Sequence, residues 1–118
     1  MEAKEYQEKV HSFADYPVPV INDDKEFVKL AWDYPVHGLA EEAGEVEGKF
    51  AKILRDKKGR YTEEDVKAIC KELGDCLWMI AETCTCIGLE LQDVMQANID
   101  KLEDRRARNV IHGSGDER

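Results

Sequence analysis

Apolar residues recur every three or four positions over a long segment of the second half of the chain. They are Val66, Ile69, Cys70, Leu73, Cys76, Leu77, Ile80, Cys84 and Ile87. This spacing places them on one side of an α-helix. Thr62, followed by three acidic residues, predicts the start of the helix, and Gly88 predicts its end. A helix with one apolar face must be covered by other elements, so the chain is restricted to folds that pack helices together.

A second apolar face precedes this one and carries Leu39, Ala43, Val46, Phe50 and Ile53. Pro35 lies upstream and lacks the amide hydrogen that a helix interior requires. We therefore expect a break or bend at Asp33–Pro35, with Pro35 either kinking a helix or standing in the first turn of a new one. The polar segment 57–60 predicts a turn between the two long helices.

The remaining chain predicts shorter elements. Residues 2 to about 14 and about 90–108 have helical spacing, and a further helical pattern begins at Lys25. The segment 15–24 holds two prolines and is expected to be an extended loop, whereas 111–118 is too rich in glycine for a helix. No strand pattern is present. The prediction is an all-α, four- to five-helix bundle that forms a single domain over residues 1–118.

Composition narrows the class of partner and the compartment. The 118 residues carry a formal net charge of −9. Modules that bind nucleic acids normally present a basic face, so we expect no nucleic acid polymer as partner. We also expect no membrane span, because no apolar run approaches about 18 residues. The four cysteines form no CxxC pair and lie in one helical segment. Reduced thiols are therefore expected, which favours a cytoplasmic protein.

Two pairs of acidic residues border the apolar faces. Glu42 and Glu45 are three positions apart, and so are Glu72 and Asp75, so each pair shares one side of its helix. If the two helices pack together, the carboxylates converge and repel one another unless a cation neutralises them. Carboxylate oxygens suit Mg²⁺ or Mn²⁺. The alternative is a solvated acidic surface, which is common on helices.

Glycines accompany both acidic pairs. Gly44 and Gly74 each cost a helix interior roughly 1 kcal/mol relative to alanine. Close approach of a second helix, or space for a ligand beside the carboxylates, would explain why this cost is tolerated.

The order of these motifs resembles a known family. Glu41-Glu42-x-x-Glu45, then 26 residues, then Glu72-x-x-Asp75 is similar to the signature of the MazG-like all-α nucleoside triphosphate pyrophosphohydrolases. Asn98-x-x-Lys101-Leu102-x-x-Arg105, followed by Gly113-Ser114-Gly115-Asp116-x-Arg118, resembles the C-terminal pattern of short, single-domain members, including phage-borne ones. The resemblance covers about residues 37–118.

The resemblance implies hydrolysis of a nucleoside or deoxynucleoside triphosphate between the α and β phosphates, giving a monophosphate and pyrophosphate. Glu42, Glu45, Glu72 and Asp75 would bind Mg²⁺, for which Mn²⁺ can substitute, and Glu41 would hold a further metal or act as general base. Relatives are homodimers or homotetramers. A phage-encoded member would work in the host cytoplasm.

Basic side chains and one amide side chain are candidates for binding the phosphates. Lys49 and Lys52 lie one and two turns beyond Glu45, and Lys49 alternatively forms an i, i+4 ion pair with Glu45. Asn98, Lys101 and Arg105 share one face of the last predicted helix.

Two further expectations concern the tail and the base. Arg118 would clamp a phosphate if the tail closes over a ligand; the alternative is a frayed terminus. Trp32 and His37 flank the proline and are candidates for stacking on the base.

Two other functions stay open on sequence grounds. One is a phosphoribosyl-ATP pyrophosphatase-like enzyme, which uses a similar acidic pattern, although the Gly113–Arg118 tail argues against it. The other is a non-catalytic, acidic helical interaction protein whose carboxylates only keep it in solution.

Overall fold

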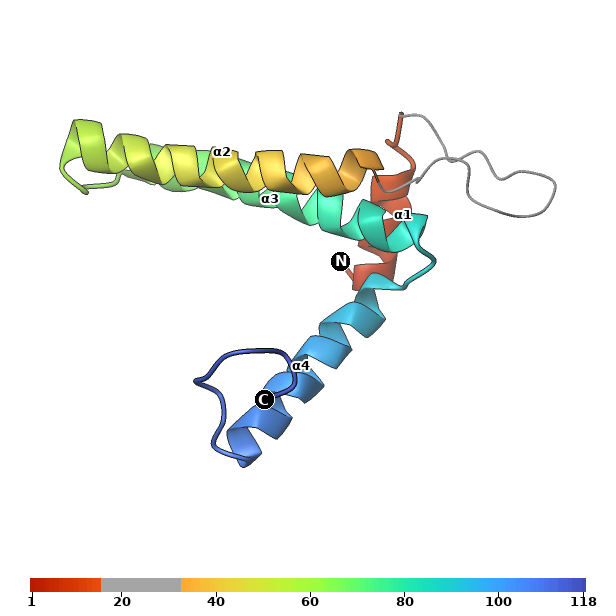
Figure 1. Ribbon diagram of the computed structural model, residues 1–118. Helices are drawn as coiled ribbons and strands as arrows, with labels where there is room; N and C mark the ends of the chain where they lie inside the picture. Colours follow the sequence, from red (N-terminus) through yellow and green to blue (C-terminus); the bar gives the residue numbers. More distant parts are fainter. Residues whose placement is uncertain (16–32) are drawn as a thin grey trace.

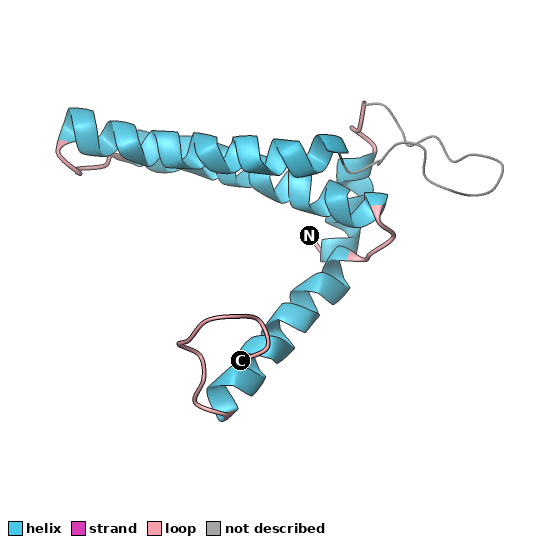
Figure 2. Ribbon diagram, viewed as in Figure 1, coloured by secondary structure: helices cyan, strands magenta, loops and turns pink. Residues whose placement is uncertain are grey.

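The computed structural model describes residues 1–15 and 33–118, and it is all-helical there. The helices are α1 (Ala3–His11), α2 (Asp33–Lys57), α3 (Glu63–Cys86) and α4 (Leu91–Ala107), as Figure 1 shows. No strand occurs among the described residues (Figure 2). The predicted all-α fold is confirmed. None of the helices described is both long and apolar enough to cross a membrane.

The two long helices, α2 and α3, form an antiparallel hairpin and lie side by side along most of their length (Figure 1). Lys58 and Gly59 connect them with positive φ angles of 52° and 80°. Thr62 then caps α3, because its hydroxyl accepts from the Asp65 amide at 3.3 Å and its own amide donates to the Asp65 carboxylate at 2.8 Å. The helix start predicted at Thr62 is therefore confirmed.

The end of α3 also agrees with the sequence. The helix ends at Cys86, and Gly88 follows with a φ of 75°, a conformation that glycine adopts without strain. The amide of Leu89 donates to the carbonyl of Cys84 at 2.8 Å and closes the turn.

A glutamine of α1 holds the junction between α3 and α4. The buried Gln7 side chain donates to the Leu89 carbonyl at 2.8 Å and to the Thr85 hydroxyl at 3.1 Å. Its oxygen accepts from the Leu91 amide at 2.7 Å, which satisfies one of the free donors at the start of α4. The core lies beside it and comprises Val10, Ala81, Cys84 and Leu91, with Tyr6 and Trp78 packed against it.

The long apolar faces of α2 and α3 are only partly covered within one chain. Ile53 is buried, but Phe50, Leu73 and Leu77 are 52%, 53% and 43% exposed. The reason is geometric, because α2 and α3 cover only each other along the outer part of the hairpin. The helix α4 turns away from them (Figure 1) and makes no contact with α2.

Close helix approach occurs at a glycine other than the two that the sequence indicated. A Cβ on Gly38 would lie 2.5 Å from Sδ of Met79, whereas Gly44 and Gly74 have open space beside them. Their cost in the helix is therefore not explained by packing within one chain.

The N-terminal third of the chain differs from the prediction in the length of its first helix. The first helix spans Ala3–His11, shorter than the predicted 2–14, and Pro35 lies buried in the first turn of α2. The helical pattern from Lys25 and most of the predicted 15–24 loop lie outside the described residues.

Candidate metal centre

Three carboxylates from α2 and α3 meet near the middle of the hairpin. Glu42, Glu72 and Asp75 can each offer an oxygen such that all three atoms lie within 4.8 Å of one another. Glu42 and Glu72 are half-buried and Asp75 is exposed, so the group is open to solvent on one side. The i, i+3 spacing on α3 presents Glu72 and Asp75 to the same stretch of α2.

Burial and the neighbouring carboxylates both act on Glu42. The pKa of Glu42 is raised above its ordinary value of 4.5, first by burial and then by the negative charges of Asp75, Glu41, Glu72 and Glu45. A bound cation stabilises carboxylates that repel one another in this way.

The donor chemistry selects the class of cation. Burial, followed by the charges of Glu42, Asp75 and Glu72, raises the pKa of the neighbouring Cys76 thiol. The Cys76 sulfur does not belong to the group of converging ligand atoms. The remaining donors are carboxylate oxygens, which fit a hard cation such as Mg²⁺ or Mn²⁺.

Glu41 and Glu45, also predicted for this site, lie on α2 with exposed side chains. Neither belongs to the three-residue group, but the charges of both contribute to the raised pKa of Glu42. Both therefore lie close enough to Glu42 for their charges to act on it.

Lys49 forms an ion pair with one member of this group. Its Nζ lies 3.1 Å from Oε1 of Glu72, so the lysine pairs across the hairpin with α3. It makes no ion pair with Glu45 in the described structure, which differs from the alternative of an i, i+4 pair.

The candidate phosphate-binding residues of α4 are not brought to the acidic group within one chain. Asn98 and Lys101 are exposed on α4, which makes no contact with α2 and adjoins the hairpin only near the core (Figure 1). Arg105 is 5% exposed, and its Nη2 donates to the Asp116 carbonyl at 2.7 Å and to the Asp116 carboxylate at 3.3 Å. Lys101 lies 3.8 Å from the same carboxylate.

The C-terminal tail folds back on α4 (Figure 1). Arg118 donates to the carbonyls of Gly115, Val110 and Ile111 at 2.6, 3.2 and 3.2 Å. Gly113 leaves room for this side chain, because a Cβ there would lie 2.9 Å from Cδ of Arg118. The tail is therefore held by its own arginine, which differs from the alternative of a frayed terminus.

One of the two candidate base-stacking residues lies near the start of α2. His37 is exposed in the second turn, and Trp32 lies outside the described residues.

One buried polar pair was not predicted from the sequence. Glu82 is fully buried and its Oε1 lies 2.8 Å from Nδ1 of His11. Glu82 is seven residues beyond Asp75 and so lies on the same side of α3, which was the available sign that it faces inward. Tyr6 of α1 lies near the acidic group too, since burial and then the charge of Asp75 raise its pKa.

Comparison with known proteins identifies the family. The MazG nucleotide pyrophosphohydrolase domain matches residues 35–110, which include the acidic residues of both long helices. This chain belongs to the MazG family. It is also 45% identical over 85 residues to the Gene 37 protein of Mycobacterium phage L5, covering 72% of this chain and 75% of the relative. No solved structure matches the chain significantly.

Membership of the MazG family has general consequences for activity. The chain is a phage-type MazG-like protein. Membership of this family indicates nucleotide pyrophosphohydrolase activity, which in the family generally depends on a metal. The acidic group of α2 and α3 is the part of the described structure with the right chemistry to hold that metal.

Proposed function

We propose that this protein is a Mg²⁺-dependent pyrophosphohydrolase that cleaves nucleoside or deoxynucleoside triphosphates between the α and β phosphates. The products are a nucleoside monophosphate and pyrophosphate, and each chain is a single domain over residues 1–118. The observation that carries the proposal is the convergence of Glu42, Glu72 and Asp75 within 4.8 Å in a MazG-family chain. In a phage infection the reaction would take place in the host cytoplasm.

The acidic residues would have two different roles, metal binding and activation of water. Glu42, Glu72 and Asp75 would hold Mg²⁺, with Mn²⁺ able to substitute, and Glu45 would contribute from the edge of the group. When bound, Mg²⁺ would neutralise phosphate charge and lower the pKa of the attacking water. Glu41, exposed one residue before Glu42, would accept the proton of that water as general base, or hold a further metal.

The remaining parts of the site bind the substrate. Lys49 lies beside Glu72 and would contact the phosphates, and His37 is the described candidate for stacking on the base. Asn98 and Lys101 lie on a helix that diverges from the acidic group, so they would reach a bound triphosphate only from a second copy of the chain. Arg105 and Arg118, both held within the tail, would join them only after the tail rearranges.

A homodimer or homotetramer agrees with the exposed apolar faces of α3 and α4. Leu73 and Leu77 on α3, and Met95 and Ile99 on α4, are 43–54% exposed in one chain. Burial of such residues against another copy stabilises an assembly by about 25 cal/mol for each Å² of apolar surface removed from water.

Substitution of the acidic residues tests the proposal. Glu42→Gln and Asp75→Asn remove a ligand charge with little change in size, and each should abolish pyrophosphate release in the presence of Mg²⁺. Glu47→Gln is the matched control, because Glu47 is exposed on α2 outside the acidic group, and it should keep wild-type turnover. Full activity in Glu42→Gln or Asp75→Asn would refute the assignment of the metal site.

A further inference from the structure

A hollow lies between α2 and α3, on the side of the acidic group nearer the turn of the hairpin. Its volume is about 110 Å³, whereas a single water needs about 10–15 Å³ on the same measure. It therefore has room for a group of several atoms. Its lining residues are Lys49, Lys52, Ile53, Asp56, Lys57, Asp65 and Ala68.

The acidic residues of the hollow are already neutralised. Both oxygens of Asp56 accept from Arg55, at 2.7 and 2.8 Å. Both oxygens of Asp65 accept from Nζ of Lys57, at 2.7 and 2.6 Å. Lys52 makes no ion pair with any described residue. The pKa of Asp56 is lowered mainly by the hydrogen bond from Arg55, and the charge of Lys52 is one of the smaller causes, acting at longer range. The ammonium group of Lys52 can therefore still donate to an anion.

The hollow also adjoins the candidate metal centre. Lys49 lines the hollow, and its Nζ reaches Oε1 of Glu72 at 3.1 Å. Ala68, on the opposite wall, is four residues before Glu72, which is about one helical turn or 5.4 Å along α3. An anion bound here would thus be a direct neighbour of the acidic group.

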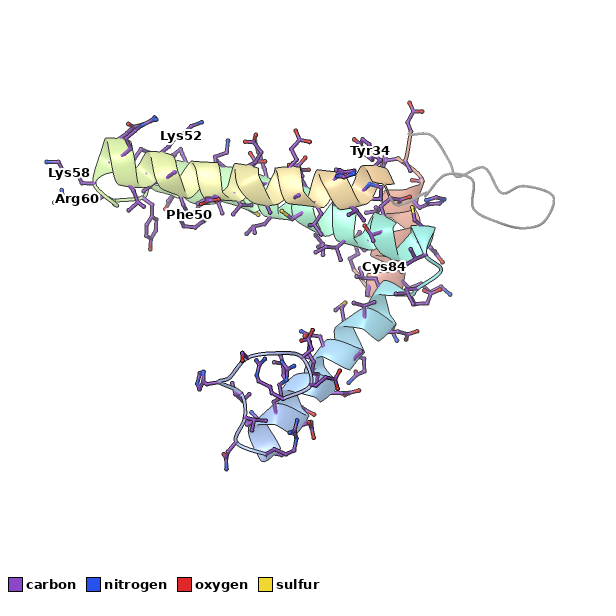
Figure 3. The ribbon with its side chains drawn as sticks, in the orientation of Figure 1. Tyr34, Phe50, Lys52, Lys58, Arg60 and Cys84 are labelled. Atoms are coloured by element: carbon purple, nitrogen blue, oxygen red, sulfur yellow. The ribbon has the colours of Figure 1, made fainter. Side chains whose placement is uncertain are left out.

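Cations concentrate around this end of the hairpin although the chain as a whole is acidic. Figure 3 shows Lys52 on the outer part of α2, with Lys58 and Arg60 at the turn beyond it. Residues 49–60 carry six lysine or arginine side chains and one acidic side chain, whereas Glu63 and Glu64 add negative charge where α3 begins. The excess of positive charge attracts a polyphosphate towards the turn. The acidic group, in contrast, repels it unless a cation is bound.

We propose that this hollow is an anion subsite that takes the terminal phosphates of the substrate and the pyrophosphate product. Lys52 donates to the phosphate oxygens, and Lys49 joins it when Glu72 is engaged as a metal ligand and no longer holds the lysine. The inference rests on the proposed function and adds to it the direction of the substrate, with its phosphates pointing along the hairpin towards the turn. A nucleoside monophosphate has no phosphate to place there and so makes no contact with this subsite.

Calorimetric titration of the full-length protein with inorganic pyrophosphate in the presence of Mg²⁺ tests this subsite. Lys52→Ala should weaken pyrophosphate binding about tenfold, the usual loss for one charge-assisted hydrogen bond. Lys52→Arg keeps the charge and should bind nearly as well as wild type. Lys67→Ala is the matched control, since Lys67 is an exposed lysine of α3 that does not line the hollow.

The outcomes separate this inference from the proposed function. Equal affinity of Lys52→Ala and Lys67→Ala for pyrophosphate, or no binding by the wild type, would overturn the subsite. Failure of the hydrolase proposal would appear differently, as a wild-type protein that binds pyrophosphate but releases none from any nucleotide.

Discussion

At the scale of single residues, the raised pKa of Glu42 has a measurable consequence for stability. In the metal-free protein the fold favours the protonated form of Glu42 more than the unfolded chain does. The resulting stabilisation is present below the ordinary pKa of 4.5 and is lost as pH rises through the raised value. We therefore expect the unfolding temperature in chelator to fall over this range.

Two comparisons check that prediction. Glu42→Gln has no carboxylate to titrate and should lose this part of the pH dependence. Addition of Mg²⁺ to the wild type at neutral pH should raise the unfolding temperature, because the cation binds the folded state. A wild type and a Glu42→Gln variant with identical pH profiles would show that the carboxylate is not under the repulsion described here.

Some site residues follow from sequence and others do not. The spacing of Glu42, Glu72 and Asp75 is enough to predict that they meet, because helical periodicity and one apolar face fix which sides of two helices face each other. The burial of Arg105 under Asp116 is set by how the tail folds back, and no periodic pattern encodes it. The pairing of His11 with Glu82 likewise depends on where α1 packs.

At the scale of helices, two glycines of α2 have opposite surroundings and predict opposite effects. Gly44→Ala should stabilise the protein by up to about 1 kcal/mol, because the space beside it is open and alanine favours a helix. Gly38→Ala gains the same propensity but must displace the buried Met79, at a cost of about 1–3 kcal/mol.

Chemical denaturation of both glycine variants, measured in chelator, checks this difference. Gly38→Ala should be less stable than Gly44→Ala by about the cost of displacing Met79. Equal stabilisation by the two substitutions would mean that α2 and α3 do not approach closely at Gly38.

Helix positions were predictable because their signals are local. The Thr62 cap and Gly88 mark the two ends of α3, and both were evident in the sequence. The direction in which α4 leaves the hairpin depends on the contacts of Gln7 with Leu89 and Leu91, more than eighty residues away in the chain. Such long-range hydrogen bonds have no sequence signature.

At the scale of the whole molecule, one chain is more extended than a self-contained domain. Its radius of gyration is 17.9 Å, whereas about 13.5 Å is typical of a compact chain of 118 residues. The divergence of α4 and the exposed apolar faces account for this shape, and both agree with assembly into a homodimer or homotetramer.

Mixing two inactive variants tests whether a second copy completes the site. Glu42→Gln removes a ligand on α2 and Lys101→Ala removes a phosphate contact on α4. If the two residues act on one substrate from different chains, a mixed dimer holds one intact site. For random exchange between symmetric dimers, activity should recover to about a quarter of wild type.

The matching control is the double variant Glu42→Gln/Lys101→Ala mixed with wild type, in which a mixed dimer has one defect in each site. Light scattering establishes that each variant is still an oligomer. Activity no higher than the sum of the two parents, in a mixture shown to exchange subunits, would contradict completion by a second copy. A clean monomer at micromolar concentration would contradict the assembly itself.

The central claim is the position of the bond that is cleaved, and product analysis tests it most directly. Wild-type protein is incubated with Mg²⁺ and a panel of ribo- and deoxyribonucleoside triphosphates, with phosphoribosyl-ATP alongside. The account predicts equal amounts of monophosphate and pyrophosphate from at least one triphosphate, and none when Mg²⁺ is chelated. Release of orthophosphate and a nucleoside diphosphate, or no turnover of any triphosphate, would contradict it.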